Sequence, residues 1–230
     1  MSESQISGDG LDLLIPVEQA GRFDIAELKF NFGEGDVDCT QVAIGAPVTD
    51  VTAKINTGAA VIFAGKAMKD SAVTVKKSKT GDSTSNVRLE NTLIEDVVLK
   101  SKKGTAVDLN IAEGKFRRSA FTAGKGKLDD SVSTGSSSKL INSEFNLRKG
   151  DNTFNLGGGS QLKKKNTVTF GKGGTDTVNI GDGVQAGKNA KLIVEGMDNK
   201  RDTVVFGGES FTREDIESGK ADLPGFLELG

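Results

Sequence analysis

Two pairs of adjacent carboxylates, Glu95-Asp96 and Asp129-Asp130, come closest to an acid/base site in this sequence. Two carboxyl groups cleave a glycosidic bond when both of them reach that bond. Adjacent residues of a β-strand point to opposite faces, so neither pair is preorganised to act on one substrate. We therefore expect no enzymatic activity and keep a carbohydrate-active solenoid enzyme as the last alternative.

Histidine, tryptophan and tyrosine are all absent, and Cys39 is the single cysteine. Without histidine the chain lacks the most common general base and the most common transition-metal ligand. A cysteine nucleophile also needs a basic partner, so we interpret Cys39 as a structural thiol. We expect no catalytic residue and no bound cofactor.

Basic side chains gather in the middle of the chain. Residues 51–200 hold 25 basic and 15 acidic residues, whereas residues 1–50 hold two basic and ten acidic residues. The densest basic runs supply our candidate partner-binding residues, which are Arg117, Arg118, Lys163, Lys164 and Lys165. A basic face can contact an acidic partner such as a capsid shell, lipopolysaccharide or nucleic acid. In the alternative interpretation, the lysines only protect strand edges from aggregation.

Nucleic acid is the least favoured of these partners. Proteins that bind single strands stack the bases on exposed aromatic side chains, and Trp and Tyr are missing here. Other protein subunits are the favoured partners. The acidic residues 1–50 can contact the basic body of another copy, which predicts a homo-oligomer or part of a larger assembly.

The elements that would carry these residues recur along the chain as short alternating apolar pairs. One series of pairs is Val61–Phe63, Val87–Leu89, Leu109–Ile111, Val132–Thr134, Phe154–Leu156, Val178–Ile180 and Val204–Phe206. The second series is Val73–Val75, Val97–Leu99, Phe121–Ala123, Phe145–Leu147, Val168–Phe170 and Leu192–Val194. Pairs within a series recur every 22 to 26 residues. The alternation has the period of a β-strand, and turn-forming residues, many of them glycine, separate the pairs.

A repeat of about 24 residues with two short strands predicts an all-β fold, a single parallel β-solenoid. Coils stacked about 4.8 Å apart would close one narrow core. A β-sandwich is the alternative, but a sandwich has no reason to keep a near-constant repeat.

The composition also predicts three regions. We expect residues 1–48 to form an acidic N-terminal cap or docking segment, residues 49–206 the solenoid, and residues 207–230 a C-terminal cap. Residues 210–218 have the pattern of one or two helical turns. No apolar stretch approaches the roughly 20 residues of a membrane helix, and no secretory signal is visible, so we expect no membrane span.

The segment Gly171–Asn179, with the sequence GKGGTDTVN, resembles the calcium-binding nonapeptide G-G-x-G-x-D-x-U-x of RTX, or haemolysin-type, repeats. Gly171, Gly174, Asp176 and Val178 match this motif, and Lys172 replaces its second glycine. The resemblance implies a solenoid in which Asp176 is a calcium ligand. It also implies an extracellular or cell-surface protein.

This chain departs from the RTX pattern at its turns. Lysine precedes glycine at Lys125-Gly126, Lys149-Gly150 and Lys172-Gly173, and an ammonium group repels a calcium ion. We therefore expect a degenerate, metal-free repeat and keep calcium as the alternative. In the metal-free form, Asp151, Asp176 and Asp202 would cap turns through local bonds from side chain to backbone.

The histidine-free, lysine-rich repeat also resembles virion structural proteins of tailed phages that infect marine cyanobacteria. This resemblance implies a structural or assembly protein of the virion, such as a capsid decoration or a tail- or fibre-associated component. The alternative is a calcium-binding RTX-like protein outside the cell or on its surface.

Overall fold

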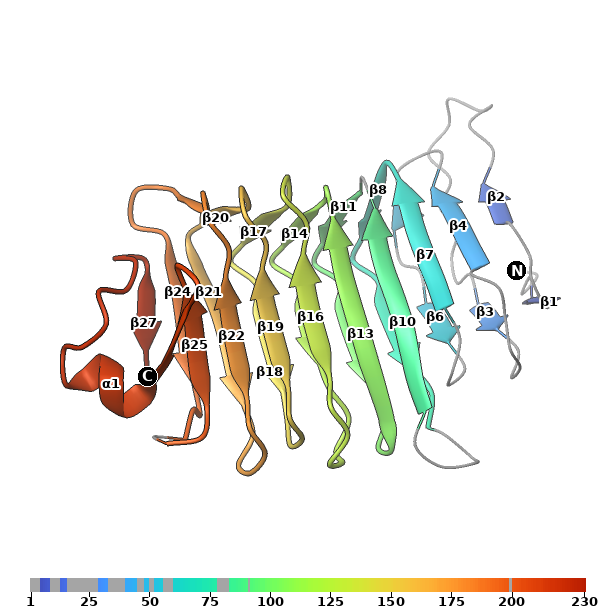
Figure 1. The fold of residues 1–230 in the computed structure, drawn as a ribbon. Coiled ribbons are helices and arrows are strands. Elements are labelled where there is room, and N and C mark those ends of the chain that lie inside the picture. Colours follow the sequence, from blue (N-terminus) through green and yellow to red (C-terminus); the bar gives the residue numbers. More distant parts are fainter. Residues whose placement is uncertain are drawn as a thin grey trace.

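The computed structural model is a parallel β-solenoid of about six coils, each about 24 residues long (Figure 1). The structure describes residues 5–8, 13–15, 29–32, 40–44, 48–49, 52–55, 60–77, 83–90, 92–198 and 200–230. Three sheets run along the length of the described part of the chain, and we call them sheets A, B and C. The predicted fold class is therefore confirmed.

Sheets A and B contain the longer strands. Sheet A consists of β1 (Gln5–Gly8), β3 (Lys29–Phe32), β6 (Thr52–Ile55), β9 (Ala72–Val75), β12 (Val98–Ser101), β15 (Ala120–Thr122), β18 (Glu144–Leu147), β21 (Lys165–Phe170), β24 (Lys191–Glu195) and β27 (Leu227–Leu229). Sheet B consists of β2 (Leu13–Ile15), β4 (Thr40–Ile44), β7 (Ala60–Gly65), β10 (Ser83–Glu90), β13 (Thr105–Ala112), β16 (Ser131–Thr134), β19 (Thr153–Leu156), β22 (Thr177–Ile180), β25 (Thr203–Phe206) and β26 (Glu209–Thr212).

Sheet C is a third set of strands that the two-strand repeat did not predict. It consists of β5 (Val48–Thr49), β8 (Ala67–Lys69), β11 (Leu93–Glu95), β14 (Lys115–Arg117), β17 (Lys139–Ile141), β20 (Gln161–Lys163) and β23 (Gln185–Ala186). Most of these strands bury a central apolar residue, as in Phe116, Leu140 and Leu162. A single inward residue shows no alternation in the sequence, so the expectation of two strands per coil was incomplete.

The register confirms the first series of apolar pairs completely. Val132, Phe154 and Val178, for example, are aligned in successive strands of sheet B. The second series is wrong by two residues at two places, because the strand partner of Val73 is Leu99 and that of Val168 is Val194. A shift of two residues keeps the same face inward, so the burial pattern could not reveal it.

The core is a narrow column of apolar side chains between the three sheets. Phe116 of sheet C, Phe145 of sheet A and Phe154 of sheet B meet there, and all three are buried. The ring centroids of Phe116 and Phe145 are 5.3 Å apart, and those of Phe145 and Phe154 are 5.2 Å apart. These contacts tie the three sheets together at the centre of the stack.

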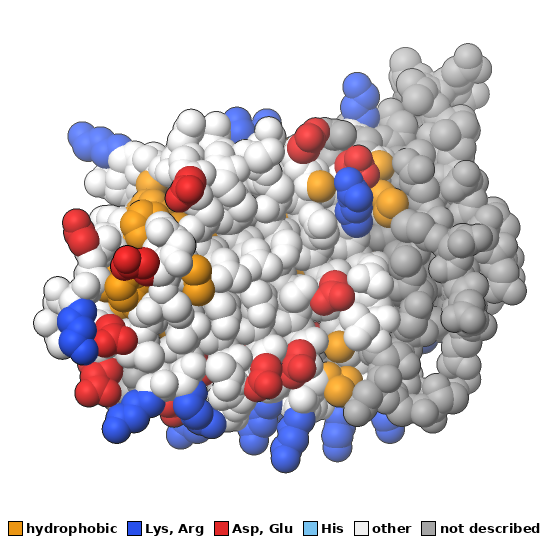
Figure 2. All heavy atoms as spheres, in the orientation of Figure 1, with side chains coloured by type: hydrophobic (Ala, Val, Ile, Leu, Met, Phe, Trp, Pro, Cys, Tyr) orange, Lys and Arg blue, Asp and Glu red, His pale blue; other side chains and the backbone are white. Residues whose placement is uncertain are grey.

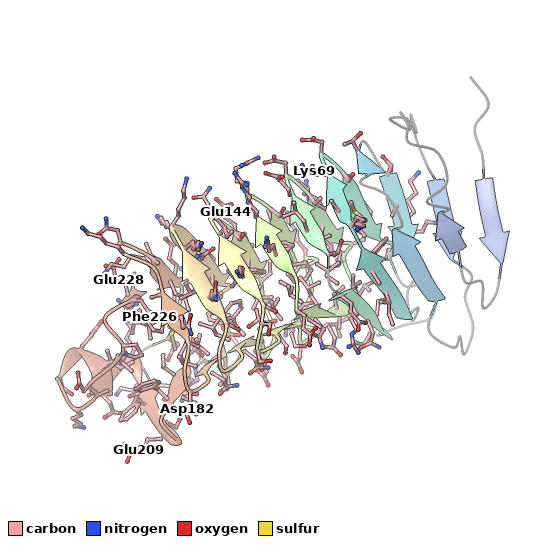
Figure 3. The ribbon with its side chains drawn as sticks, turned by 90° about the horizontal axis from the view of Figure 1, so that it is seen from above. Lys69, Glu144, Asp182, Glu209, Phe226 and Glu228 are labelled. Carbon is pink, nitrogen blue, oxygen red and sulfur yellow. The ribbon has the colours of Figure 1, made fainter. Side chains whose placement is uncertain are left out.

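The C-terminal residues close the stack. Strand β26 pairs antiparallel with β25, and β27 pairs with β24. The last strands of sheets B and A therefore both come from residues 207–230. Helix α1 (Arg213–Glu217) begins at a capping box between Thr212 and Asp215, which confirms the predicted helical turn. Phe226, which lies at the end of the stack in Figure 3, packs against the core.

At the other end, the described strands of residues 1–48 continue the sheets. Strand β3 pairs in parallel with β6, and β4 pairs in parallel with β7. Cys39 and the rest of this segment lie outside the described residues. Within the described part of the chain, no helix has the length and apolar character needed to cross a membrane.

Candidate partner-binding site

The turns that lead from a sheet A strand to the next sheet B strand carry basic residues in successive coils. These residues are Lys102, Lys103, Lys125, Lys127, Arg148, Lys149, Lys172, Lys200 and Arg201. The coils are stacked in register, so residues far apart in sequence become neighbours along the solenoid axis. Figure 2 shows the result as a row of Lys and Arg side chains along its lower edge, where these turns lie in Figure 1.

Six of these side chains surround one depression, which we call the basic groove. Its volume is about 660 Å³, and its lining residues are Lys103, Lys125, Gly126, Lys127, Asn146, Arg148, Lys149, Gly171 and Lys172. The five lysines are exposed, and no described acidic side chain lines the groove. The groove is therefore a concentrated positive surface built from four consecutive coils.

None of the six basic side chains in the groove forms an ion pair or side-chain hydrogen bond with a described residue. Like charges stacked at strand spacing repel one another, and only solvent and salt reduce this repulsion. An anionic partner would replace that repulsion with attraction. The groove thus has the electrostatic character of a binding site.

A row of carboxylates borders the groove on the side of sheet B. Asp129 Oδ1 accepts a hydrogen bond from the backbone N–H of Asp151 at 2.7 Å, and Asp151 Oδ1 accepts one from Thr175 at 2.7 Å. Both carboxylates also line a second depression of about 480 Å³, together with Lys127, Lys149 and other residues. The positive strip is therefore narrow at these two turns, because a carboxylate follows two residues after Lys127 and two residues after Lys149.

Arg117 and Arg118, two of the predicted partner-binding residues, are already ion-paired. Arg118 Nη2 lies 2.7 Å from Glu95 Oε1 and 2.6 Å from Asp96 Oδ2, and Arg117 Nε lies 3.2 Å from Glu95 Oε1. The hydrogen bond from Arg118 lowers the pKa of Asp96, so this carboxylate is ionised at neutral pH. A partner would have to compete with these carboxylates for both arginines.

The other predicted residues, Lys163, Lys164 and Lys165, are exposed at the corner between sheets C and A. Lys164 has a φ of +59°, and Arg118 occupies the same corner two coils earlier with a φ of +46°. The structure therefore places these lysines on the same corner as Arg118 and away from the basic groove.

The sequence-based candidates came from the longest runs of basic residues, whereas stacking gathers shorter basic runs from several coils. The recurrence of lysine before glycine at Lys125, Lys149 and Lys172 was the signal for the groove. Each of these residues is separated from the next by one coil, so the groove becomes visible only once the register is known.

Asp176, the predicted calcium candidate, belongs to a row of buried polar side chains that crosses five coils. Asp130, Asn152, Asp176 and Asp202 each accept a hydrogen bond from a backbone N–H of the preceding coil. The N···O distances of these four bonds are 2.8, 3.0, 2.9 and 2.9 Å. The aspartates were expected to cap their own turns. Asp202 does so, because its Oδ2 accepts a hydrogen bond from the backbone N–H of Asp198, and its Oδ1 also joins two coils. Asp151 and Asp176 join one coil to the next instead.

Burial shapes the acid–base behaviour of this row. Burial raises the pKa of Asp176 to about 6, and hydrogen bonds from Asn152 oppose the increase. Asp176 Oδ1 accepts two hydrogen bonds from Asn152, so this oxygen is engaged with donors of the protein. Among the described residues, no group of three or more acidic, Cys or His residues could hold a metal ion. Calcium binding at Asp176 stays the alternative to the metal-free repeat.

The two carboxylate pairs behave differently from each other. Asp130 is buried and Asp129 is exposed, as the alternation of a strand predicts. The same expectation is wrong for Glu95 and Asp96, which both contact Arg118 because Asp96 sits in a corner with a φ of +55°.

The comparisons with known proteins identify no relative: no family model, curated protein or solved structure matches this chain. The solenoid itself is established by its strand pairing. The RTX-like and phage-virion resemblances rest on the sequence features that suggested them.

Proposed function

We propose that this protein is a non-enzymatic structural component that docks on an acidic partner through the basic groove. The observation that carries the proposal is the gathering of six basic side chains around one depression, none of which forms an ion pair within the described part of the chain. A stack of hydrogen-bonded coils holds these charges at fixed spacing, which lowers the cost of ordering them on binding.

The setting we propose is a larger assembly in which this protein also contacts other protein subunits. The histidine-free, lysine-rich repeat resembles virion proteins of cyanophages, and this resemblance supports a virion as that assembly. The unequal charge of residues 1–50 and 51–200 supports contacts between copies as well.

Removing the groove lysines should abolish most of the docking. The groove variant is Lys125→Gln, Lys127→Gln, Lys149→Gln and Lys172→Gln in one chain. Each exposed ion contact contributes about 0.2 to 1 kcal/mol, so we expect binding to weaken by about tenfold or more. The measurement is the dissociation constant on a surface coated with poly-L-glutamate, by biolayer interferometry, at several salt concentrations.

The matched control removes four exposed lysines from the other side of the solenoid, with Lys115→Gln, Lys163→Gln, Lys164→Gln and Lys165→Gln. We expect this control variant to bind within about twofold of the original protein. Equal weakening in both variants would mean that only total charge matters. Weakening in the control alone would move the docking site to Lys163–Lys165.

The second candidate function is calcium binding, which the match of Asp176 to the RTX motif favours. Because Lys172 lies in the same turn and Asp176 is held by Asn152, we expect the fold to form without the ion. Circular dichroism melting with EDTA and with millimolar calcium should give the same midpoint. A chain that acquires its β-structure only with calcium would favour the RTX-like function instead.

A further inference from the structure

We infer that the acidic partner of the basic groove is a single chain of anionic polysaccharide that lies along the solenoid axis. This inference rests on the proposed function and makes its partner specific. Three features of the groove lead to it: the spacing of its charges, its width, and the side chains that it lacks.

The spacing of the charges favours a polymer with closely repeated anionic groups. The groove draws on turns that follow four consecutive sheet A strands, from Lys103 after β12 to Lys172 after β21. Neighbouring coils are about 4.8 Å apart, so one lysine of each coil, from Lys103 to Lys172, repeats at about that interval along the solenoid axis. A sugar ring linked at its opposite ends is about as long as this interval, so a polysaccharide with an anionic group on every ring can present one to each coil.

An extended acidic peptide fits this spacing less well. Alternate side chains of an extended peptide point to opposite faces, so carboxylates on one face are about 6.6 Å apart. That interval does not match the coil spacing. The offset between carboxylates and lysines would therefore grow with each coil. An acidic peptide is therefore a weaker occupant than a polysaccharide.

The width of the groove favours one narrow chain. The carboxylates of Asp129 and Asp151 run parallel to the lysines and are held in place by backbone hydrogen bonds. A nucleic-acid duplex or a broad acidic surface would bring its own negative charge against these carboxylates. A single chain can remain on the positive side of this border.

The side chains that line the groove disfavour single-stranded nucleic acid. No aromatic side chain lines it, whereas proteins that bind single strands usually stack bases on aromatic rings. The lining consists of lysine stems, ammonium groups, one guanidinium and the amide of Asn146. Ammonium groups bind sulfate and carboxylate, and an amide can bind a sugar hydroxyl.

The test compares four immobilised polyanions at physiological salt: heparin, polygalacturonate, single-stranded oligo(dT) and poly-L-glutamate. We expect the dissociation constant for at least one polysaccharide to be about tenfold or more below those for oligo(dT) and poly-L-glutamate. We also expect the groove variant to lose this preference and the control variant with Lys115, Lys163, Lys164 and Lys165 replaced to keep it.

The outcomes separate this inference from the function on which it rests. Tighter binding to oligo(dT) or poly-L-glutamate than to both polysaccharides, still lost in the groove variant, would overturn the polysaccharide and leave the docking function intact. Binding of all four polymers that the groove substitutions do not change would overturn both proposals.

Discussion

Replacing Gly174 by alanine should destabilise the protein by about 3 kcal/mol or more, because the new methyl group has no space. Gly174 has a φ of +100°, and a Cβ at this position would lie 1.9 Å from the carbonyl oxygen of Gly150 in the preceding coil. Both atoms are fixed by the backbone, so neither can move aside without separating the coils. We expect a large decrease in the urea midpoint, measured by circular dichroism.

The neighbouring residue provides the matched control. Gly173 also has a positive φ, of +91°, but a Cβ there would meet no atom within 4 Å. Gly173→Ala therefore tests backbone strain without the clash, and we expect it to cost about 1 kcal/mol. If the two variants lose the same stability, the close approach of the coils at Gly174 does not limit the fold.

The protein should become less stable as the pH rises from about 4 to about 7.5. Burial raises the pKa of Asp130 to about 7 and that of Asp176 to about 6, whereas an ordinary aspartate has a pKa near 3.8. The folded state therefore holds protons that the unfolded state releases in this range. This loss of stability is absent at pH values below the ordinary pKa and complete at pH values above the raised pKa.

The acidic neighbours of both groups also raise their pKa, whereas the hydrogen bonds from Val107 and Asn152 oppose the increase. The charges of Asp108 and Asp129 add to the effect of burial on Asp130, and Asp202 and Asp151 do so for Asp176.

Each pH unit between the two pKa values of a group corresponds to about 1.4 kcal/mol, so we expect the free energy of unfolding to decrease by several kcal/mol in total. Urea denaturation at a series of pH values measures it.

Substitutions identify the group responsible. Asp130→Asn keeps an oxygen for the N–H of Val107 and removes the ionisable group, so the pH dependence should become clearly shallower. Asn152 occupies the same position one coil later, which shows that asparagine fits in this row. Asp129→Asn, at the exposed neighbour, should leave most of the dependence in place. A stability that rises with pH over this range would contradict the assignment.

The sequence predicted the fold well because the solenoid repeats its inward residues. Pairs such as Phe154–Leu156 and Val178–Ile180 carried enough alternation to locate sheet B and its register. Sheet A was located with two errors of two residues, since Val97 and Leu99 are both buried and nothing in the sequence separates them. Sheet C was not predicted, because a strand with one inward apolar residue shows no alternation of apolar and polar residues.

The site was predicted less well, for a different physical reason. Arg117 and Arg118 looked available from the sequence, but Glu95 and Asp96 of the preceding coil neutralise them. Lys149 has one basic neighbour in the sequence, Arg148, but stacking places both in a groove with basic residues of three other coils. Ion pairs and grooves between coils depend on which residues become neighbours, and this depends on turn lengths that vary from coil to coil.

The row of buried acceptors also has a direction, and that direction bears on how the chain is made. The N–H of Val107 depends on Asp130, the N–H of Asp130 on Asn152, and so on toward Asp202. A ribosome releases the N-terminal coil first, so each coil emerges before the side chain that completes it. Folding during synthesis would then advance one coil behind the growing chain, and a chain that stopped early would end on buried donors without acceptors.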